Sequence, residues 1–127
     1  MSLPTGLLYT REHEWLRVVD DTTALIGITD YAQNSLGDIT FVELPKAGRE
    51  LKAGSTFGVV ESVKAASDLF APIDATVVES NEEVVGAPEL LNQDPYEKGW
   101  LLRVTIKDRA QLAALLSPDD YSKAISG

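Results

Sequence analysis

The sequence predicts a mainly β protein with short helices, including a helical C-terminus. Three observations support this prediction. Short apolar runs are bounded by Gly, Pro, Asp and Asn, a pattern typical of strands joined by turns. A strand-like segment at 38–43 recurs at 74–79 with four of six positions matching. After residue 107 the apolar spacing changes to that of a helix. With 127 residues, the chain is expected to form one domain over 1–127.

Seven strands are expected, because each segment is rich in β-branched or aromatic residues and ends at turn residues. They lie at 15–19, 24–28, 38–44, 56–62, 67–71, 74–80 and 100–106. The segments 46–54 and 81–94 are expected to be loops, the second with one helical turn at 88–91.

Helix ends are predicted from capping residues. Asp30 is expected to cap a short helix with Gln33 as its capping-box partner, and Gly37 is expected to end that helix in the left-handed conformation. Asp108 is expected to begin a helix over 109–116. Ser117 and Pro118 have the order of an N-cap and a first helical residue, and the final helix is expected to reach about residue 125.

Composition excludes several classes of function. The chain has no cysteine, so protein disulfides and thiol chemistry are excluded, and its one histidine argues against a histidine-based metal site. A net charge of −9 disfavours nucleic-acid backbones and anionic membranes, and fits docking onto basic protein surfaces. No apolar run approaches the ~18 residues that span a bilayer. Residues 1–6 lack the features of a signal or transit peptide.

Lys64 is the candidate functional residue. It stands between the strands expected at 56–62 and 67–71, and the small residues that follow it leave the tip of this hairpin uncluttered. A lone lysine in a turn is usually only a solvated charge. A Ser–Lys or lysine-base catalytic site is an alternative, using Ser62 or Ser67. Glu61 and Asp68 oppose that alternative, since nearby carboxylates keep a lysine protonated.

Residues 61–68, Glu-Ser-Val-Lys-Ala-Ala-Ser-Asp, resemble the lipoyl-attachment segment of the glycine cleavage system H-protein family. Further segments resemble the same family in the same order, at 9–15, 27–33, 36–45, 91–96 and 99–100. Biotin carriers have a similar hairpin, but their lysine normally stands between methionines. Lipoyl domains of 2-oxoacid dehydrogenases more often have Asp before the lysine and belong to longer chains with linkers.

The resemblance implies a barrel-sandwich hybrid, in which two sheets form a flattened barrel. It also implies that Lys64 carries lipoic acid in amide linkage and that Glu61, Ser62, Val63 and Ala65 are read by the lipoate-attaching enzyme. Such a protein is a non-catalytic carrier and is expected to be a monomer. A lipoyl carrier or relay that serves 2-oxoacid dehydrogenase complexes is the alternative.

The resemblance further implies three partners. The lipoyl arm accepts the aminomethyl group of glycine from a pyridoxal-phosphate-dependent decarboxylase. It delivers that group to a tetrahydrofolate-dependent aminomethyltransferase, and dihydrolipoamide dehydrogenase then reoxidises it. The expected location is the bacterial cytoplasm, or the mitochondrial matrix for a processed eukaryotic chain.

Glu14 is the second residue to which the resemblance gives a role. In the family, the loaded arm folds back into a cleft lined by a Glu of the His-Glu-Trp opening, which is residues 13–15 here. Asp68, close to Lys64 in sequence, is expected to assist. Without the resemblance, Glu14 would be interpreted as one more surface acid.

Overall fold

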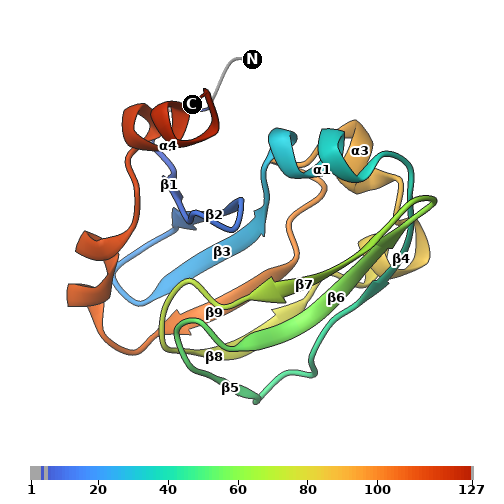
Figure 1. Ribbon diagram of the computed structural model, residues 1–127. Helices are drawn as coiled ribbons and strands as arrows, with labels where there is room; N and C mark the ends of the chain where they lie inside the picture. Colours follow the sequence, from blue (N-terminus) through green and yellow to red (C-terminus); the bar gives the residue numbers. More distant parts are fainter. Residues whose placement is uncertain (1–3, 5, 127) are drawn as a thin grey trace.

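The computed structural model describes residue 4 and residues 6–126, and two antiparallel sheets with short helices make up the architecture (Figure 1). The larger sheet has the strand order β1-β2-β3-β9-β8-β5, and the smaller has the order β4-β6-β7. The strands are β1 Leu8–Tyr9, β2 Glu14–Val18, β3 Thr23–Ile28, β4 Ile39–Glu43, β5 Glu50–Leu51, β6 Thr56–Ser62, β7 Ala66–Phe70, β8 Ala75–Ser80 and β9 Leu102–Ile106. The helices are α1 Asp30–Leu36, α2 Glu82–Gly86, α3 Leu90–Gln93, the 3₁₀ helix η1 Arg109–Ala114 and α4 Pro118–Ser126. The expected mainly β class with two sheets and a helical C-terminus is confirmed, and among the described residues the two sheets share no strand, so they do not close into a barrel.

The main core lies between the two sheets, because successive strand residues point to opposite faces and the apolar ones point inward. The larger sheet contributes Leu16, Ala24, Ile26, Ile28, Val77, Leu102 and Val104, and the smaller contributes Val42, Val60 and Leu69. The two copies of the repeated segment lie in different sheets, as the edge strand β4 and the interior strand β8. Burying both sheets against one core fixes the hairpin of β6 and β7 relative to the rest of the molecule.

A second, aromatic cluster holds the C-terminal helix. It contains Leu7, Tyr9, Trp15 and Tyr121, all nearly or fully buried. The rings of Tyr9 and Tyr121 stack with their centroids 4.7 Å apart. The backbone of Tyr9 also exchanges two hydrogen bonds with Leu116, at 2.8 and 2.7 Å. The helix α4 therefore lies against β1 (Figure 1).

The cap of α1 is one residue earlier than predicted. Thr29 is the N-cap: its backbone is extended, and its hydroxyl accepts a hydrogen bond from the Ala32 N–H at 3.2 Å. Asp30 is already helical, and its carboxylate accepts a hydrogen bond from Gln33 Nε2 at 2.6 Å. Gly37 ends the helix with the expected positive φ of 78°, but its ψ of −154° turns the chain directly into β4.

Three other predictions need correction. The helix α2 forms within the expected loop 81–94, since the Asn81 side chain accepts from the Glu83 N–H and caps it. The segment after Asp108 is a 3₁₀ helix, and the loop 46–54 contains the two-residue strand β5. At α4 the predicted cap is confirmed, because the Asp120 N–H donates to the Ser117 hydroxyl at 3.1 Å. Residues 1–3 and 5 of the N-terminal segment, and residue 127, lie outside the described part.

Gly27 is required by close packing against Trp15. A Cβ at Gly27 would lie 2.4–2.6 Å from three atoms of the indole, which is itself pinned by a 3.0 Å hydrogen bond to the Pro95 carbonyl. We expect Gly27→Ala to lower the free energy of unfolding by about 1–3 kcal/mol, as overpacking does. Urea titration measures this. Gly86→Ala is the matched control, since nothing lies within 4 Å of its added Cβ, and equal losses for both variants would contradict the packing argument.

Candidate functional site

Lys64 lies at the tip of the β6–β7 hairpin, as predicted. The last ladder pair is Glu61 with Ala66. Between them the Ser62 N–H donates to the Ala65 carbonyl at 2.7 Å and closes a tight turn. The Ser62 hydroxyl accepts from the N–H groups of Lys64 and Ala65, at 3.3 and 3.1 Å. This hydroxyl therefore shapes the turn and presents Lys64 to solvent.

The base of the turn rests on the corner between α1 and β4. The Val63 N–H donates to the Asp38 carbonyl at 3.1 Å. The Lys64 Cε lies 3.4 Å from the place where a Cβ on Gly37 would be, so the lysine side chain runs beside this glycine. Asn92 of α3 donates to the Gly37 carbonyl at 2.8 Å and thereby fixes the corner.

The residues around Lys64 do not assemble a Ser–Lys site. The Ser62 hydroxyl is engaged by the turn backbone, and within the described residues Lys64 forms no ion pair with Glu61 or Asp68. Val63 is 70% exposed, and Glu61, Ala65 and Asp68 are exposed as well. The tip therefore offers a presented amine on a stiff turn and no enclosing pocket.

Glu14 is not a surface acid: it is only 1% exposed. Its Oε1 accepts a hydrogen bond from the Thr10 hydroxyl at 2.7 Å, and its Oε2 accepts one from the Phe70 N–H at 3.2 Å. Phe70 is the last residue of β7, the strand that leads away from Lys64. The carboxyl group thus joins the N-terminal segment to the hairpin.

Burial dominates the electrostatics of Glu14. It raises the pKa of this carboxyl from 4.5 to about 7, while the hydrogen bonds from Thr10 and Phe70 lower it and the charge of Glu12 raises it. A carboxyl group with this pKa changes its charge near neutral pH.

The structure brings Glu14 of β2 to the far end of β7 from Lys64, and it does not bring Glu14, Asp68 and Lys64 into contact. Phe70, which contacts Glu14, is six residues from Lys64, which is ~20 Å of extended chain. Asp68 lies between them on β7, opposite Val59. Only a long, flexible group on Lys64 could connect the two ends.

Five hollows of the molecule lie away from Lys64. Of the hollows in residue 4 and residues 6–126, five have volumes of 230–580 Å³, and Lys64 and Glu14 line none of these five. The smallest, of 230 Å³, is lined by Glu12, Gly54 and Phe70 and opens beside the backbone that Glu14 contacts.

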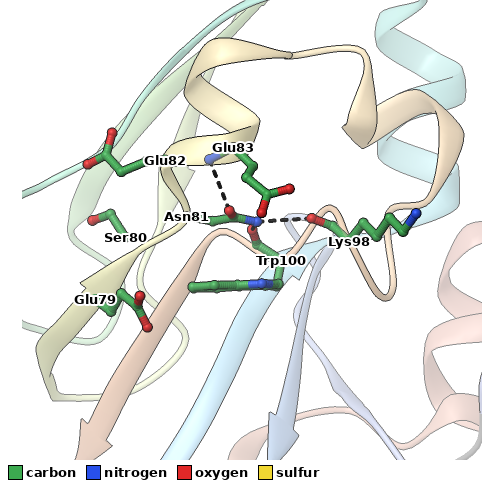
Figure 2. Close-up of a pocket in the computed structure, with 7 residues that line it drawn as sticks. All are labelled: Glu79, Ser80, Asn81, Glu82, Glu83, Lys98 and Trp100. Atoms are coloured by element: carbon green, nitrogen blue, oxygen red, sulfur yellow. Dashed lines mark hydrogen bonds between the residues drawn. The ribbon is translucent and has the colours of Figure 1, made fainter.

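Figure 2 shows a 340 Å³ hollow at the start of α2. The Asn81 amide donates there to the carbonyls of Lys98 and Trp100, at 2.9 and 2.7 Å, and accepts from the Glu83 N–H (Figure 2). All polar atoms of the Asn81 side chain are hydrogen-bonded, so Asn81 has a structural role: it joins the start of α2 to the backbone at Lys98 and Trp100. The described residues contain no cluster of acids or histidine that could hold a metal ion and no helix long and apolar enough to cross a membrane.

Comparison with known proteins decides the family. The model of the family "Glycine cleavage H-protein" matches residues 7–127. The chain belongs to this family. It is 58% identical to the glycine cleavage system H protein of Carboxydothermus hydrogenoformans over 97% of this chain and 94% of that one, and 56% identical to that of Opitutus terrae over 98% of each. The crystal structure of the H protein from Mycobacterium marinum superposes with a TM-score of 0.88 at 34% identity, covering 98% of this chain and all of that one.

Membership of the glycine cleavage H-protein family confirms the resemblance drawn from the separate segments, and the fold expected from it. Sequence reasoning missed Thr10, Phe70, Gly37 and Asn92 as parts of the site. Their contributions come from a hydroxyl, a backbone N–H, a missing side chain and an amide. Asn92 falls within the matching segment 91–96, so the resemblance pointed to its neighbourhood without giving its role.

Proposed function

We propose that this chain is the lipoyl carrier of a glycine cleavage system and that lipoate is attached to Lys64. The observation that carries this proposal is the exposed Lys64 at the tip of a stiff hairpin, within the segment that resembles the family's attachment site. The carrier takes the aminomethyl group of glycine from the decarboxylase to the aminomethyltransferase, and dihydrolipoamide dehydrogenase restores it. The chain itself catalyses no step.

The tip fits an enzyme that must close around one amine. Ser62 holds the turn, exposed Val63 offers an apolar contact, and Ala65 is small enough to leave the approach free. Glu61, exposed at the end of β6, is the charged feature beside the turn. These four residues are therefore proposed as the recognition set for lipoate attachment.

When bound, lipoate supplies the disulfide that takes up the one-carbon unit and later becomes a dithiol. The protein supplies placement. Amidation removes the charge of Lys64, and the tether keeps the arm at a raised effective concentration near each docked partner. The chain has no cysteine that could exchange with the arm's disulfide.

Glu14 is proposed to protect the loaded arm, with Asp68 on its path along β7. A charged amine brought beside the Glu14 carboxyl favours its ionised form, and the carboxylate in turn favours the protonated amine. Protonation removes the nitrogen lone pair that would otherwise break the carbon–sulfur bond and leave a thiolate on the arm. Water would then convert the released unit to formaldehyde and ammonium. Burial strengthens this mutual effect because little solvent screens it.

Peptide mapping tests the attachment site. After exposure to a lipoate ligase and lipoate, we expect the adduct on the peptide that contains Lys64 alone. Lys46 and Lys52 are internal controls, because both are exposed and lie in turns of the same molecule. An adduct on either of them, or none on Lys64, would contradict the proposal.

Formaldehyde release tests the protective role. For protein loaded with the one-carbon unit, we expect Glu14→Gln to release formaldehyde about tenfold faster, which is the effect of one pKa unit on the amine. Gln keeps the shape of the side chain and removes its charge. Asp68→Asn, at an exposed position, should have the smaller effect. Equal rates for Glu14→Gln and wild type would remove Glu14 from the site.

A further inference from the structure

A hydrogen-bonded network connects the C-terminal helix to the turn that carries Glu14. The Tyr121 hydroxyl, from α4, lies 2.8 Å from His13 Nδ1 and 2.8 Å from Thr29 Oγ1. Tyr121 is fully buried, and its ring stacks on Tyr9. One side chain of α4 therefore touches both the residue before Glu14 and the N-cap of α1.

His13 has a backbone conformation that is unfavourable for a residue other than glycine. Its φ is 73°, and it is the one residue other than glycine with a positive φ among residue 4 and residues 6–126. Such a conformation is uncommon outside glycine and persists when surrounding contacts hold it. Three contacts do so here: the Tyr121 hydroxyl, the ring of Tyr31 at 4.5 Å between centroids, and the Thr29 N–H, which donates to the His13 carbonyl at 3.0 Å.

The conformation of His13 sets where the next side chain points. The turn is closed by the His13 N–H donating to the Thr10 carbonyl at 3.1 Å and the Thr10 N–H donating to the Glu14 carbonyl at 2.9 Å. It brings the Thr10 hydroxyl within 2.7 Å of Glu14 Oε1 and leaves Oε2 facing the Phe70 N–H. With His13 at a negative φ, the backbone would leave this turn, and the hydrogen bonds of the turn and of the Glu14 carboxyl group would not all form.

We propose that Tyr121 is a positioning residue: through His13 it holds the left-handed turn that directs the Glu14 carboxyl group at strand β7 of the lipoyl hairpin. The C-terminal helix thus takes part in the site, although it lies beside β1 and away from the hairpin (Figure 1). This inference deepens the protective role proposed for Glu14 and rests on it.

The protonation states suit the network. Burial lowers the pKa of His13 below 6.5, so Nδ1 of the neutral imidazole can accept a hydrogen bond from the Tyr121 hydroxyl. Burial raises the pKa of Tyr121 to about 12, so its hydroxyl keeps that proton, and Thr29 can donate to the phenol oxygen. The hydroxyl therefore has a partner on each side, which packing of α4 alone would not require.

The test compares two losses of one hydroxyl within the same aromatic stack. Tyr121→Phe removes the contacts with His13 and Thr29, whereas Tyr9→Phe removes only a 2.8 Å hydrogen bond to the Pro4 carbonyl. Carboxyl ¹³C NMR of the unmodified protein follows the titration of Glu14. We expect its midpoint to fall from about 7 toward 4.5 in Tyr121→Phe, because a loosened turn admits water, and to stay in place in Tyr9→Phe.

Hydrogen exchange of the Phe70 amide is the second readout, because this N–H donates to Glu14. We expect exchange about fivefold faster in Tyr121→Phe, the effect of losing one hydrogen bond, and unchanged in Tyr9→Phe. An unmoved Glu14 midpoint together with unchanged Phe70 exchange in a folded Tyr121→Phe would overturn the proposal.

The route through His13 has its own control. Glycine adopts a positive φ freely, so His13→Gly keeps the turn without help from Tyr121. Adding Tyr121→Phe to His13→Gly should then leave the Glu14 midpoint where His13→Gly alone puts it. A further fall in the double variant would show that Tyr121 acts by another route and would also overturn the proposal.

These readouts are independent of the loaded arm. If Glu14→Gln releases formaldehyde at the wild-type rate while Tyr121→Phe still moves the Glu14 midpoint, the protective role fails and the positioning network stands. If Glu14→Gln speeds release and Tyr121→Phe moves nothing, the protective role stands and the positioning role fails.

Discussion

Lys64→Arg should reduce glycine–bicarbonate exchange, measured with the decarboxylase, to the level seen without this protein. Arginine keeps the charge and nearly the length of lysine, but its guanidinium is not an acceptor for amide formation with lipoate. The effect is expected to be complete because the hairpin presents only this amine at its tip. The variant should fold normally, since Lys64 is exposed and forms no ion pair within the described residues.

Two measurements keep this prediction specific. Lys52→Arg, at another exposed turn, should retain full exchange after lipoylation. Urea unfolding of Lys64→Arg should match wild type, because a surface substitution usually changes stability by less than ~0.5 kcal/mol. Exchange by folded, unmodified Lys64→Arg above the background would show that the carrier chemistry lies elsewhere.

Glu14→Gln should change how stability depends on pH. In the folded protein the pKa of Glu14 is about 7, and the ordinary value for the unfolded chain is 4.5. A carboxyl group whose pKa is raised by folding stabilises the fold fully below its unfolded pKa, and this stabilisation is lost as pH rises through the folded pKa. Between pH 4 and pH 8 the wild type should therefore lose ~3 kcal/mol relative to Glu14→Gln.

Urea unfolding of both proteins across this pH range measures the difference. His13, whose pKa is lowered by burial, changes stability in the opposite direction, but it is present in both proteins and cancels. A constant offset from burying the Gln amide also cancels. Glu61→Gln, at an exposed carboxyl of the hairpin, is the matched control for the loss of one carboxylate. Parallel curves for Glu14→Gln and wild type would mean that burial does not raise the pKa of Glu14.

The sequence was sufficient to predict the features that depend on local pattern. Strand alternation and turn residues predicted β6 to the residue and placed Lys64 between β6 and β7. Ser117 and Pro118 marked the start of α4, because a cap is a contact between neighbours in sequence. At α1 the same reasoning was one residue off, since Thr29 and Asp30 are both capping residues and only the backbone distinguishes them.

Tertiary structure alone decided the environment of Glu14. The sequence by itself favoured a surface acid, and the resemblance favoured a cleft. This carboxyl contacts Phe70, 56 residues away, and it follows a turn at His13, whose ring contacts Tyr121, 108 residues away from His13. Desolvation depends on which distant segments cover a group, and a positive φ outside glycine depends on contacts that outweigh local preference. The sequence therefore determined where Lys64 stands, at the tip of the hairpin. The contact of the N-terminal segment with β7 and the packing of α4 against β1, which only the tertiary structure shows, decided the environment of Glu14.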